Sequence, residues 1–139
     1  MAQIPVGIIM HGVTGRMGKN QHLIRSIVQV RAEGGVLLAN GDRLMPDPIL
    51  IGRNAEKIAA LAQEYGIERW GTSIDEALDN PADTIFFDAA TTQARPGLLK
   101  KAISKGKHVY SEKPVAMGLD EALSLYHFAR EKGVCHGVV

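Results

Sequence analysis

Three glycines at three-residue intervals stand near the start of the chain, in the segment His11-Gly12-Val13-Thr14-Gly15-Arg16-Met17-Gly18. An apolar run, residues 6–10, precedes them, and apolar residues at helical spacing follow. The glycines therefore join a buried strand to a helix. A helix N-terminus presents unpaired N–H groups and partial positive charge, and glycines let the backbone approach a pyrophosphate. The segment predicts a dinucleotide-binding loop.

The spacing fits two versions of such a loop. In the usual G-x-G-x-x-G pattern, Met10 stands at the first glycine. Read as G-x-x-G-x-x-G, the motif ends at Gly18. Both versions predict cofactor contacts from one set of loop residues: Gly12, Val13, Thr14, Gly15, Arg16 and Met17. Arg16 would add charge beside the pyrophosphate, and a solvated surface arginine is the alternative.

The second core strand ends at Gly52-Arg53-Asn54 without a carboxylate. NAD-selective domains usually place Asp or Glu there to bond the ribose hydroxyls. The guanidinium of Arg53 suits a ribose 2′-phosphate, and Asn54 can hydrogen-bond the same group. The pair favours NADP(H) over NAD(H). The alternative is a solvated Arg53 and an Asn54 that only caps a helix.

Small and hydroxyl residues follow the fourth strand, in Asp88-Ala89-Ala90-Thr91-Thr92-Gln93. Alanines let a cofactor ring approach, and the hydroxyls of Thr91 and Thr92 can reach phosphate or ribose. Ordinary threonine turns explain the same residues equally well.

The triplet Glu112-Lys113-Pro114 follows the fifth strand. A lysine held near a nicotinamide ring and a sugar hydroxyl can donate a hydrogen bond or a proton. Pro114 restricts Lys113 to extended geometry. By chemistry alone a solvated Glu/Lys pair is the commoner outcome.

These segments need a framework that brings strand ends together. Strand and helix alternate along the chain, which predicts an α/β, Rossmann-type, doubly wound parallel sheet with right-handed crossovers and helices on both faces. We expect about six strands, near 6–10, 49–51, 69–71, 84–89, 107–111 and 134–139. A small hairpin insertion near 36–45 is predicted from Asn40-Gly41, with Pro46 and Pro48 ending it. Helices are expected near 19–33, 54–65, 73–79, 95–105 and 119–132, and ligands are expected at the carboxyl ends of the strands.

Composition excludes several classes of protein. The chain has 139 residues, 45% of them hydrophobic and 22% charged, with a net charge of +1. This balance is that of a globular domain and gives no case for nucleic-acid or anionic-membrane binding. One cysteine excludes an internal disulfide framework. No membrane span or signal peptide is visible, so we expect a soluble, cytoplasmic protein.

The remaining single residues favour structural roles. The five histidines lack metal-ligand spacing, so no metal is expected. His11 lies in the glycine loop, and contact with the cofactor is the alternative role for it. Trp70 and Tyr126 are interpreted as core or interface packing, and Cys135 as an inert thiol in a buried strand.

Together, the β-α-β glycine loop and Gly-Lys-His-Val-x-x-Glu-Lys-Pro at residues 106–114 resemble the glucose-fructose oxidoreductase / inositol dehydrogenase / rhizopine-catabolism family (Gfo/Idh/MocA). The resemblance covers essentially the whole chain. It implies reversible hydride transfer between a nicotinamide cofactor and a hydroxyl carbon of a sugar, inositol or related polyol. Gly12, Gly15, Thr91, Glu112 and Lys113 match family positions, and Lys113 is the one that contacts substrate and nicotinamide. Met10 and Thr92, which replaces a proline, depart from the pattern.

The resemblance also implies a second domain. Family members continue into an α/β domain that supplies the substrate pocket, further catalytic groups and usually the oligomer interface. We therefore interpret residues 1–139 as the cofactor-binding half of a longer homo-oligomeric enzyme, inactive alone.

Two other hypotheses remain. One is a stand-alone nucleotide-binding or regulatory module without catalysis. The other is a reductase of the dihydrodipicolinate reductase type, whose loop also reads Gly-x-x-Gly-Arg-Met-Gly; the Glu-Lys-Pro triplet argues against it.

Overall fold

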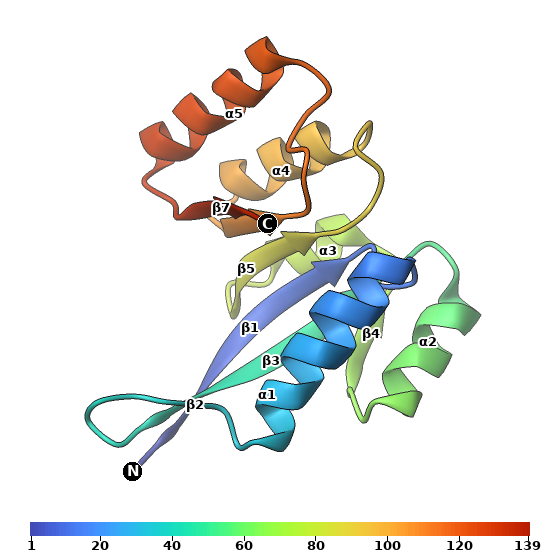
Figure 1. Cartoon of the computed structure of the whole chain (residues 1–139), viewed down its shortest axis with the longest axis vertical. Coiled ribbons are helices and arrows are strands. Elements are labelled where there is room, and N and C mark those ends of the chain that lie inside the picture. Colours follow the sequence, from blue (N-terminus) through green and yellow to red (C-terminus); the bar gives the residue numbers. More distant parts are fainter.

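A seven-stranded sheet forms the centre of the molecule, and the computed structural model describes all residues from 1 to 139 (Figure 1). The strand order is β2-β3-β1-β5-β6-β7, with β4 also pairing with β3. Every pairing is parallel except that of β2 with β3. The elements in chain order are β1 (Gln3–His11), η1 (Gly18–Val28), α1 (Gln29–Ala32), β2 (Val36–Leu37), β3 (Arg43–Ile51), α2 (Ala55–Glu64), β4 (Arg69–Gly71), α3 (Ile74–Asp79), β5 (Asp83–Asp88), α4 (Arg95–Ser104), β6 (His108–Ser111), α5 (Leu119–Lys132) and β7 (His136–Val138).

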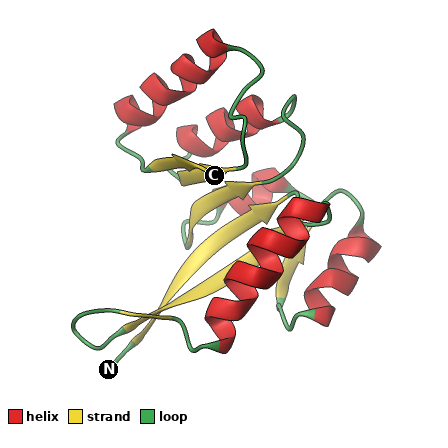
Figure 2. Cartoon of the chain, viewed as in Figure 1, coloured by secondary structure: helices red, strands yellow, loops and turns green.

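The predicted doubly wound topology is confirmed. From β1 the chain moves outward to β3 and β4, then returns to β5 on the other side of β1. The order of the strands therefore reverses at β1. Helices cover both faces of the sheet (Figure 2). None of them combines the length and apolar character that crossing a membrane requires.

Neighbouring residues of the central strands divide between two separate cores. Ile9 of β1 joins the core beneath α3, α4 and α5, whereas the adjacent Met10 joins the core beneath η1 and α2. Phe86 and Phe87 of β5 divide in the same way. This follows from the strand period of two, which turns successive side chains to opposite faces. Full burial of a side chain such as Phe86 contributes about 1.5–3 kcal/mol.

The hairpin near residues 36–45 is confirmed, but the strand after it differs from the prediction. Val36 and Leu37 pair antiparallel with Leu44 and Arg43. Pro46 and Pro48 do not interrupt the chain: they lie inside one continuous strand, β3, which pairs with β1 along its whole length. Neither β2 nor β4 pairs with residues 45–48 on the other edge of β3. The two prolines are two positions apart, so their missing N–H groups face the same edge, and an open edge tolerates them.

The helix boundaries follow the residues that predicted them. The side chain of Asn54 accepts a hydrogen bond from the Lys57 N–H (3.0 Å), and Ser73 accepts one from the Glu76 N–H (3.2 Å). Gly133 ends α5 in the left-handed conformation, with φ of 67°. The helix after the glycine loop has wide π-type turns in η1 and continues as α1. Asn54 and Ser73 thus set where α2 and α3 begin, and Gly133 sets where α5 ends.

The interpretation of Cys135 as a thiol in a buried strand was wrong. Cys135 is exposed, because β7 begins only at His136 and Cys135 lies in the connection before it. Of the two roles expected for Trp70, core or interface packing, the core role is excluded, because Trp70 lies on the short edge strand β4 and is 44% exposed; the interface role stays a prediction. Tyr126 is also 40% exposed, and its ring contacts that of His136 edge-on at 5.4 Å.

Candidate functional site

Four strand ends lie side by side at one edge of the sheet. The register pairs His11, the last residue of β1, with Ile51 of β3 on one side and Asp88 of β5 on the other. Asp88 pairs in turn with Ser111, the last residue of β6. The loops that leave these strands, residues 12–17, 52–54, 89–94 and 112–118, therefore emerge in a row. All four segments singled out in the sequence are brought to this edge.

The three glycines of the first loop have different reasons for lacking a side chain. Gly12 has φ of +79°, and a Cβ there would lie 2.3 Å from the Ala90 nitrogen. A Cβ on Gly18 would lie 2.2 Å from the Gly12 oxygen. At Gly15 the nearest atom would be 3.4 Å away, an ordinary distance. The chain itself thus requires Gly12 and Gly18, whereas Gly15 leaves an open surface on the loop.

The exposed part of the loop offers hydrogen-bond donors. Thr14, Gly15, Arg16 and Met17 are exposed, whereas the side chain of Val13 is buried in the core under η1 and α2. Only the backbone of Val13 is free to contact a ligand. The N–H groups of Arg16 and Met17 have no acceptor within the chain, and the first bond of the helix is from Lys19 to the Gly15 carbonyl (2.8 Å). Unpaired N–H groups at a helix start suit a phosphate.

The end of β3 presents an unpaired cation. Arg53 is exposed and forms neither a hydrogen bond nor an ion pair within the chain. Asn54 is exposed as well, and its side-chain oxygen caps α2. A second lone pair of that oxygen and both amide hydrogens stay available. The geometry is compatible with contact to a ribose or its phosphate.

The segment after β5 is held through its backbone. The Ala89 N–H donates to the His11 carbonyl (2.9 Å), and the Thr91 carbonyl accepts from the Arg95 N–H (3.2 Å). Thr91 is exposed and Thr92 is half-buried, and neither hydroxyl bonds within the chain. Both hydroxyls remain available to a ligand.

Glu112 and Lys113 have opposite surroundings. Glu112 is 7% exposed, and its Oε1 accepts a hydrogen bond from Nε2 of His22 (2.6 Å). Its Oε2 accepts from the Lys113 N–H (3.3 Å). The bond from His22 outweighs the cost of burial and lowers the pKa of Glu112. Lys113 is exposed and its ammonium has no partner in the chain, so the lysine is the member of the pair that is free to act.

A buried ionic network that the sequence did not predict lies beside these loops. Asp88, fully buried, accepts hydrogen bonds from Nδ1 of His11 (2.7 Å) and Nε of Arg95 (2.9 Å). Arg95 is 2% exposed and also donates to the carbonyls of Ala90 and Pro114. One signal was present in the sequence. A cation in the first turn of a helix opposes the helix dipole and therefore calls for a nearby acceptor.

The two histidines near the site, His11 and His22, make hydrogen bonds and packing contacts within the chain. His11 and His22 each bond a single carboxylate, and His22 also packs on Phe87 with the ring centroids 4.5 Å apart. No three side chains of His, Cys, Asp or Glu gather as metal ligands would.

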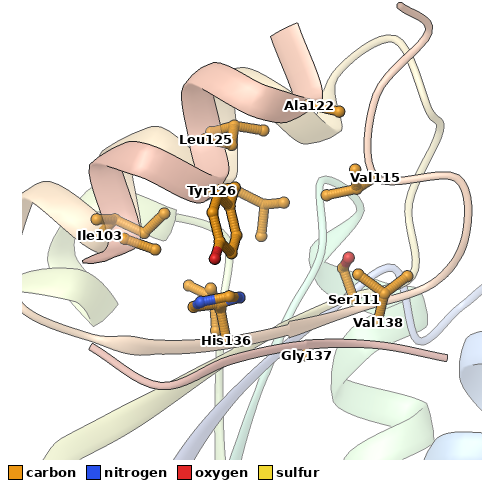
Figure 3. A pocket seen from close by; sticks show the side chains of 12 residues that line it. Ile103, Ser111, Val115, Ala122, Leu125, Tyr126, His136, Gly137 and Val138 are labelled. Carbon is orange, nitrogen blue, oxygen red and sulfur yellow. The ribbon is translucent and has the colours of Figure 1, made fainter. Parts of the chain in front are cut away.

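An apolar cavity of about 210 Å³ lies behind the Lys113 turn, between α5 and the strands β6 and β7 (Figure 3). Figure 3 shows Tyr126 above His136 and the hydroxyl of Ser111 pointing up from the strand on the side of Val115. Ser111 Oγ is buried without a hydrogen-bond partner. A second hollow, of about 500 Å³, lies between η1 and the sheet near Phe87 and Tyr110. Neither hollow includes the glycine loop or Lys113.

A parallel sheet whose order reverses at β1, with a glycine loop at that point, defines a Rossmann-type dinucleotide-binding domain. Residues 6–139 match the family model described as oxidoreductase family, NAD-binding Rossmann fold (GFO_IDH_MocA). The chain belongs to this family and is an NAD(P)-binding domain of it. The resemblance seen in the sequence is thereby confirmed.

Relatives and solved structures agree with this assignment. The chain is 44% identical over 134 residues to D-xylose dehydrogenase of Paenarthrobacter nicotinovorans, a match that covers 96% of the chain and 34% of that protein. Levoglucosan dehydrogenase in complex with NADH and levoglucosan superposes with a TM-score of 0.77 at 23% identity, over 98% of the chain and 34% of that protein. A 3-ketoreductase of Actinomadura kijaniata, in complex with NADP and TDP-benzene, superposes with a TM-score of 0.70 at 18% identity, over 95% and 35%. The chain thus spans about a third of the length of these proteins.

Proposed function

We propose that the full-length protein is an NAD(P)-dependent dehydrogenase of a sugar, inositol or related polyol, and that residues 1–139 are its cofactor-binding domain. The observation that carries this proposal is the row of strand ends that places the glycine loop and the free Lys113 at one edge of the sheet in a chain of this family. The 44% identity to a D-xylose dehydrogenase favours a sugar substrate. It also favours catalysis over a stand-alone binding module or a dihydrodipicolinate-type reductase.

The residues divide the work as follows. The loop of Gly12, Val13, Thr14, Gly15, Arg16 and Met17 holds the pyrophosphate with its unpaired N–H groups and exposed backbone. Thr91 and Thr92 bond the ribose or phosphate from the neighbouring strand end. Glu112 acts through the backbone turn it stabilises, since both of its oxygens are engaged within the chain.

Lys113 is the proposed catalytic residue. A bound nicotinamide would supply the hydride chemistry, taking up the hydride from the hydroxyl-bearing carbon of the substrate. The hydroxyl proton must leave at the same time, so that the C–O bond becomes a carbonyl. The amine of Lys113 would hydrogen-bond the substrate oxygen and take up this proton during oxidation, and the resulting ammonium would return the proton to the oxygen during reduction. Its position on an exposed turn, at the same ends of the strands as the glycine loop, supports this role.

NADP(H) is the preferred cofactor in this proposal. Arg53 is an unpaired guanidinium at the end of β3, and Asn54 beside it keeps free donors. Both fit a ribose 2′-phosphate, and an arginine binds phosphate by a rigid pair of N–H groups.

The rest of the protein completes the enzyme. A second domain supplies the substrate pocket and further catalytic groups, and forms the contacts of a homo-oligomer. We place the enzyme in the cytoplasm, among the pools of its cofactor.

The proposal is tested by titrating the full-length protein with NADPH and NADH and following intrinsic fluorescence. Saturable binding of either is expected, followed by reduction of the oxidised cofactor with D-xylose, an inositol or levoglucosan as the substrate. The proposal is refuted if the protein binds neither NADPH nor NADH. Light scattering of the same sample measures the oligomeric state.

A further inference from the structure

The turn Glu112–Pro114, which carries Lys113, is held from both faces of the sheet. On one face, His22 of η1 binds the Glu112 carboxylate at 2.6 Å. On the other, Arg95 at the start of α4 donates to the Pro114 carbonyl. The helices η1 and α4 pack in the two separate cores, so the two contacts to the turn come from opposite faces of the sheet. Lys113 lies between the two residues held in this way, Glu112 and Pro114, and its ammonium is free.

Arg95 binds three acceptors in two segments: Asp88 and Ala90 at the end of β5, and Pro114 after β6. Its Nε donates to Asp88 (2.9 Å), one Nη donates to the Ala90 carbonyl (2.6 Å), and the other donates to the Pro114 carbonyl. The guanidinium is planar and rigid, so these acceptors cannot shift independently. The Glu112 N–H also donates to the Asp88 carbonyl (2.9 Å). The Lys113 turn is thereby fixed relative to the segment that contains Ala90.

The same network reaches the glycine loop. Asp88 accepts a hydrogen bond from His11, the last residue before Gly12 (2.7 Å). The backbone of Ala90 lies so close to Gly12 that a Cβ on Gly12 would be 2.3 Å from the Ala90 nitrogen. A single buried arginine therefore connects the loop proposed for the pyrophosphate with the lysine proposed for the nicotinamide end.

We propose that Arg95 and His22 are positioning residues for Lys113: they set where its ammonium stands relative to the glycine loop, and so relative to a bound nicotinamide. Neither touches substrate or cofactor. The inference rests on the proposed function, since it assigns a purpose to the position of Lys113.

The test uses the full-length protein with the variants Arg95→Lys and His22→Gln. Lysine keeps a charge for Asp88 but cannot bind three acceptors in one plane, and glutamine keeps a donor but not the imidazole geometry. The matched control is Arg69→Lys. Arg69 binds the fully buried Asp83, the first residue of β5. This ion pair lies at the amino ends of the strands, whereas Lys113 follows a carboxyl end.

Three quantities are measured for each variant. The first is the midpoint of thermal unfolding. The second is affinity for NADPH and NADH, compared with 2′,5′-ADP and ADP-ribose, which lack the nicotinamide. The third is kcat and KM with D-xylose, an inositol and levoglucosan. Arg95→Lys is expected to lower kcat about tenfold or more with KM changed less than threefold, and His22→Gln to lower it severalfold. Both substitutions should weaken the binding of NADPH and NADH more than the binding of 2′,5′-ADP and ADP-ribose.

The control separates positioning from stability. Arg69→Lys should lose thermal stability to a similar degree and keep the wild-type kcat and the wild-type ratio of dinucleotide to fragment affinity. The inference is overturned if the site variants keep wild-type values, or if their losses match those of the control. If Arg95→Lys does not fold, His22→Gln decides in the same way. If no sugar is oxidised, the affinity ratios decide, and a wild-type protein that binds neither cofactor refutes the proposed function itself.

Discussion

Replacing Gly12 and Gly15 separately by alanine should produce opposite defects, although the two glycines are three residues apart in one loop. At Gly12 the left-handed φ of +79° costs an alanine about 1–2 kcal/mol. The added Cβ would also stand 2.3 Å from the Ala90 nitrogen and 2.4 Å from the Ala89 carbonyl carbon. These are backbone atoms and cannot turn away, so overpacking adds about 1–3 kcal/mol. We expect Gly12→Ala to lower the free energy of unfolding by about 2–5 kcal/mol.

Gly15→Ala should leave the fold intact. Its Cβ would meet nothing closer than 3.4 Å, and the φ of Gly15 lies outside the left-handed region. Loss of backbone freedom in the unfolded chain makes this change neutral or stabilising by up to about 1 kcal/mol. The methyl group would, however, stand on the exposed surface proposed to receive the pyrophosphate. We expect the affinity for NADPH and NADH to fall at least tenfold, a loss of about 1.4 kcal/mol or more.

The assay is thermal unfolding of both full-length variants without cofactor, followed by fluorescence titration with NADPH and NADH. The pattern expected is a lowered midpoint for Gly12→Ala and weakened binding at an unchanged midpoint for Gly15→Ala. Equal destabilisation by both, or wild-type binding by Gly15→Ala, would refute the division of labour between the glycines.

Three further predictions concern the cofactor, pH and domain organisation. Arg53→Ala should raise the Kd for NADPH tenfold or more and that for NADH less than threefold; equal losses in the two titrations would remove Arg53 from the phosphate role. The pKa of Glu112 is lowered in the fold by its bond to His22, so its stabilising contribution is complete above its unfolded pKa and disappears as pH falls through the lower folded value. Thermal unfolding between pH 6 and 3 should therefore depend less on pH in Glu112→Gln than in the wild type, and parallel curves would contradict this. Residues 1–139 alone should bind cofactor and oxidise no sugar, and dehydrogenase activity of this fragment in a cofactor-reduction assay would exclude the need for a second domain.

The parts of the fold that could be predicted are those encoded locally. Asn54 and Ser73 cap helices through the N–H group three residues ahead, so adjacent residues contain the whole signal. The buried strand of the glycine loop is visible as an apolar run, and parallel order then brings the strand ends to one edge. The apolar run and the parallel strand order are therefore enough to predict where the loops of the candidate site lie.

The parts that could not be predicted depend on contacts distant in sequence. Asp88 and His11 are 77 positions apart, and they meet only because β1 and β5 are neighbours in the sheet. The bond of His22 to Glu112 spans 90 positions. Pro46 was interpreted as a strand end because the sequence does not reveal which edge of β3 is unpaired. Such features depend on topology rather than on local propensity.

The hairpin β2–β3 has a practical consequence for labelling the enzyme. Its turn, residues 38–42, joins β2 to the start of β3, whereas the candidate site lies beyond the carboxyl end of the same strand. The nine residues of β3 separate the two places by roughly 30 Å at the rise of an extended strand. Because Cys135 is also an exposed thiol, it would first be replaced by serine; a fluorophore or affinity handle attached through Asn40→Cys would then report on or immobilise the protein without entering the space where cofactor and substrate meet.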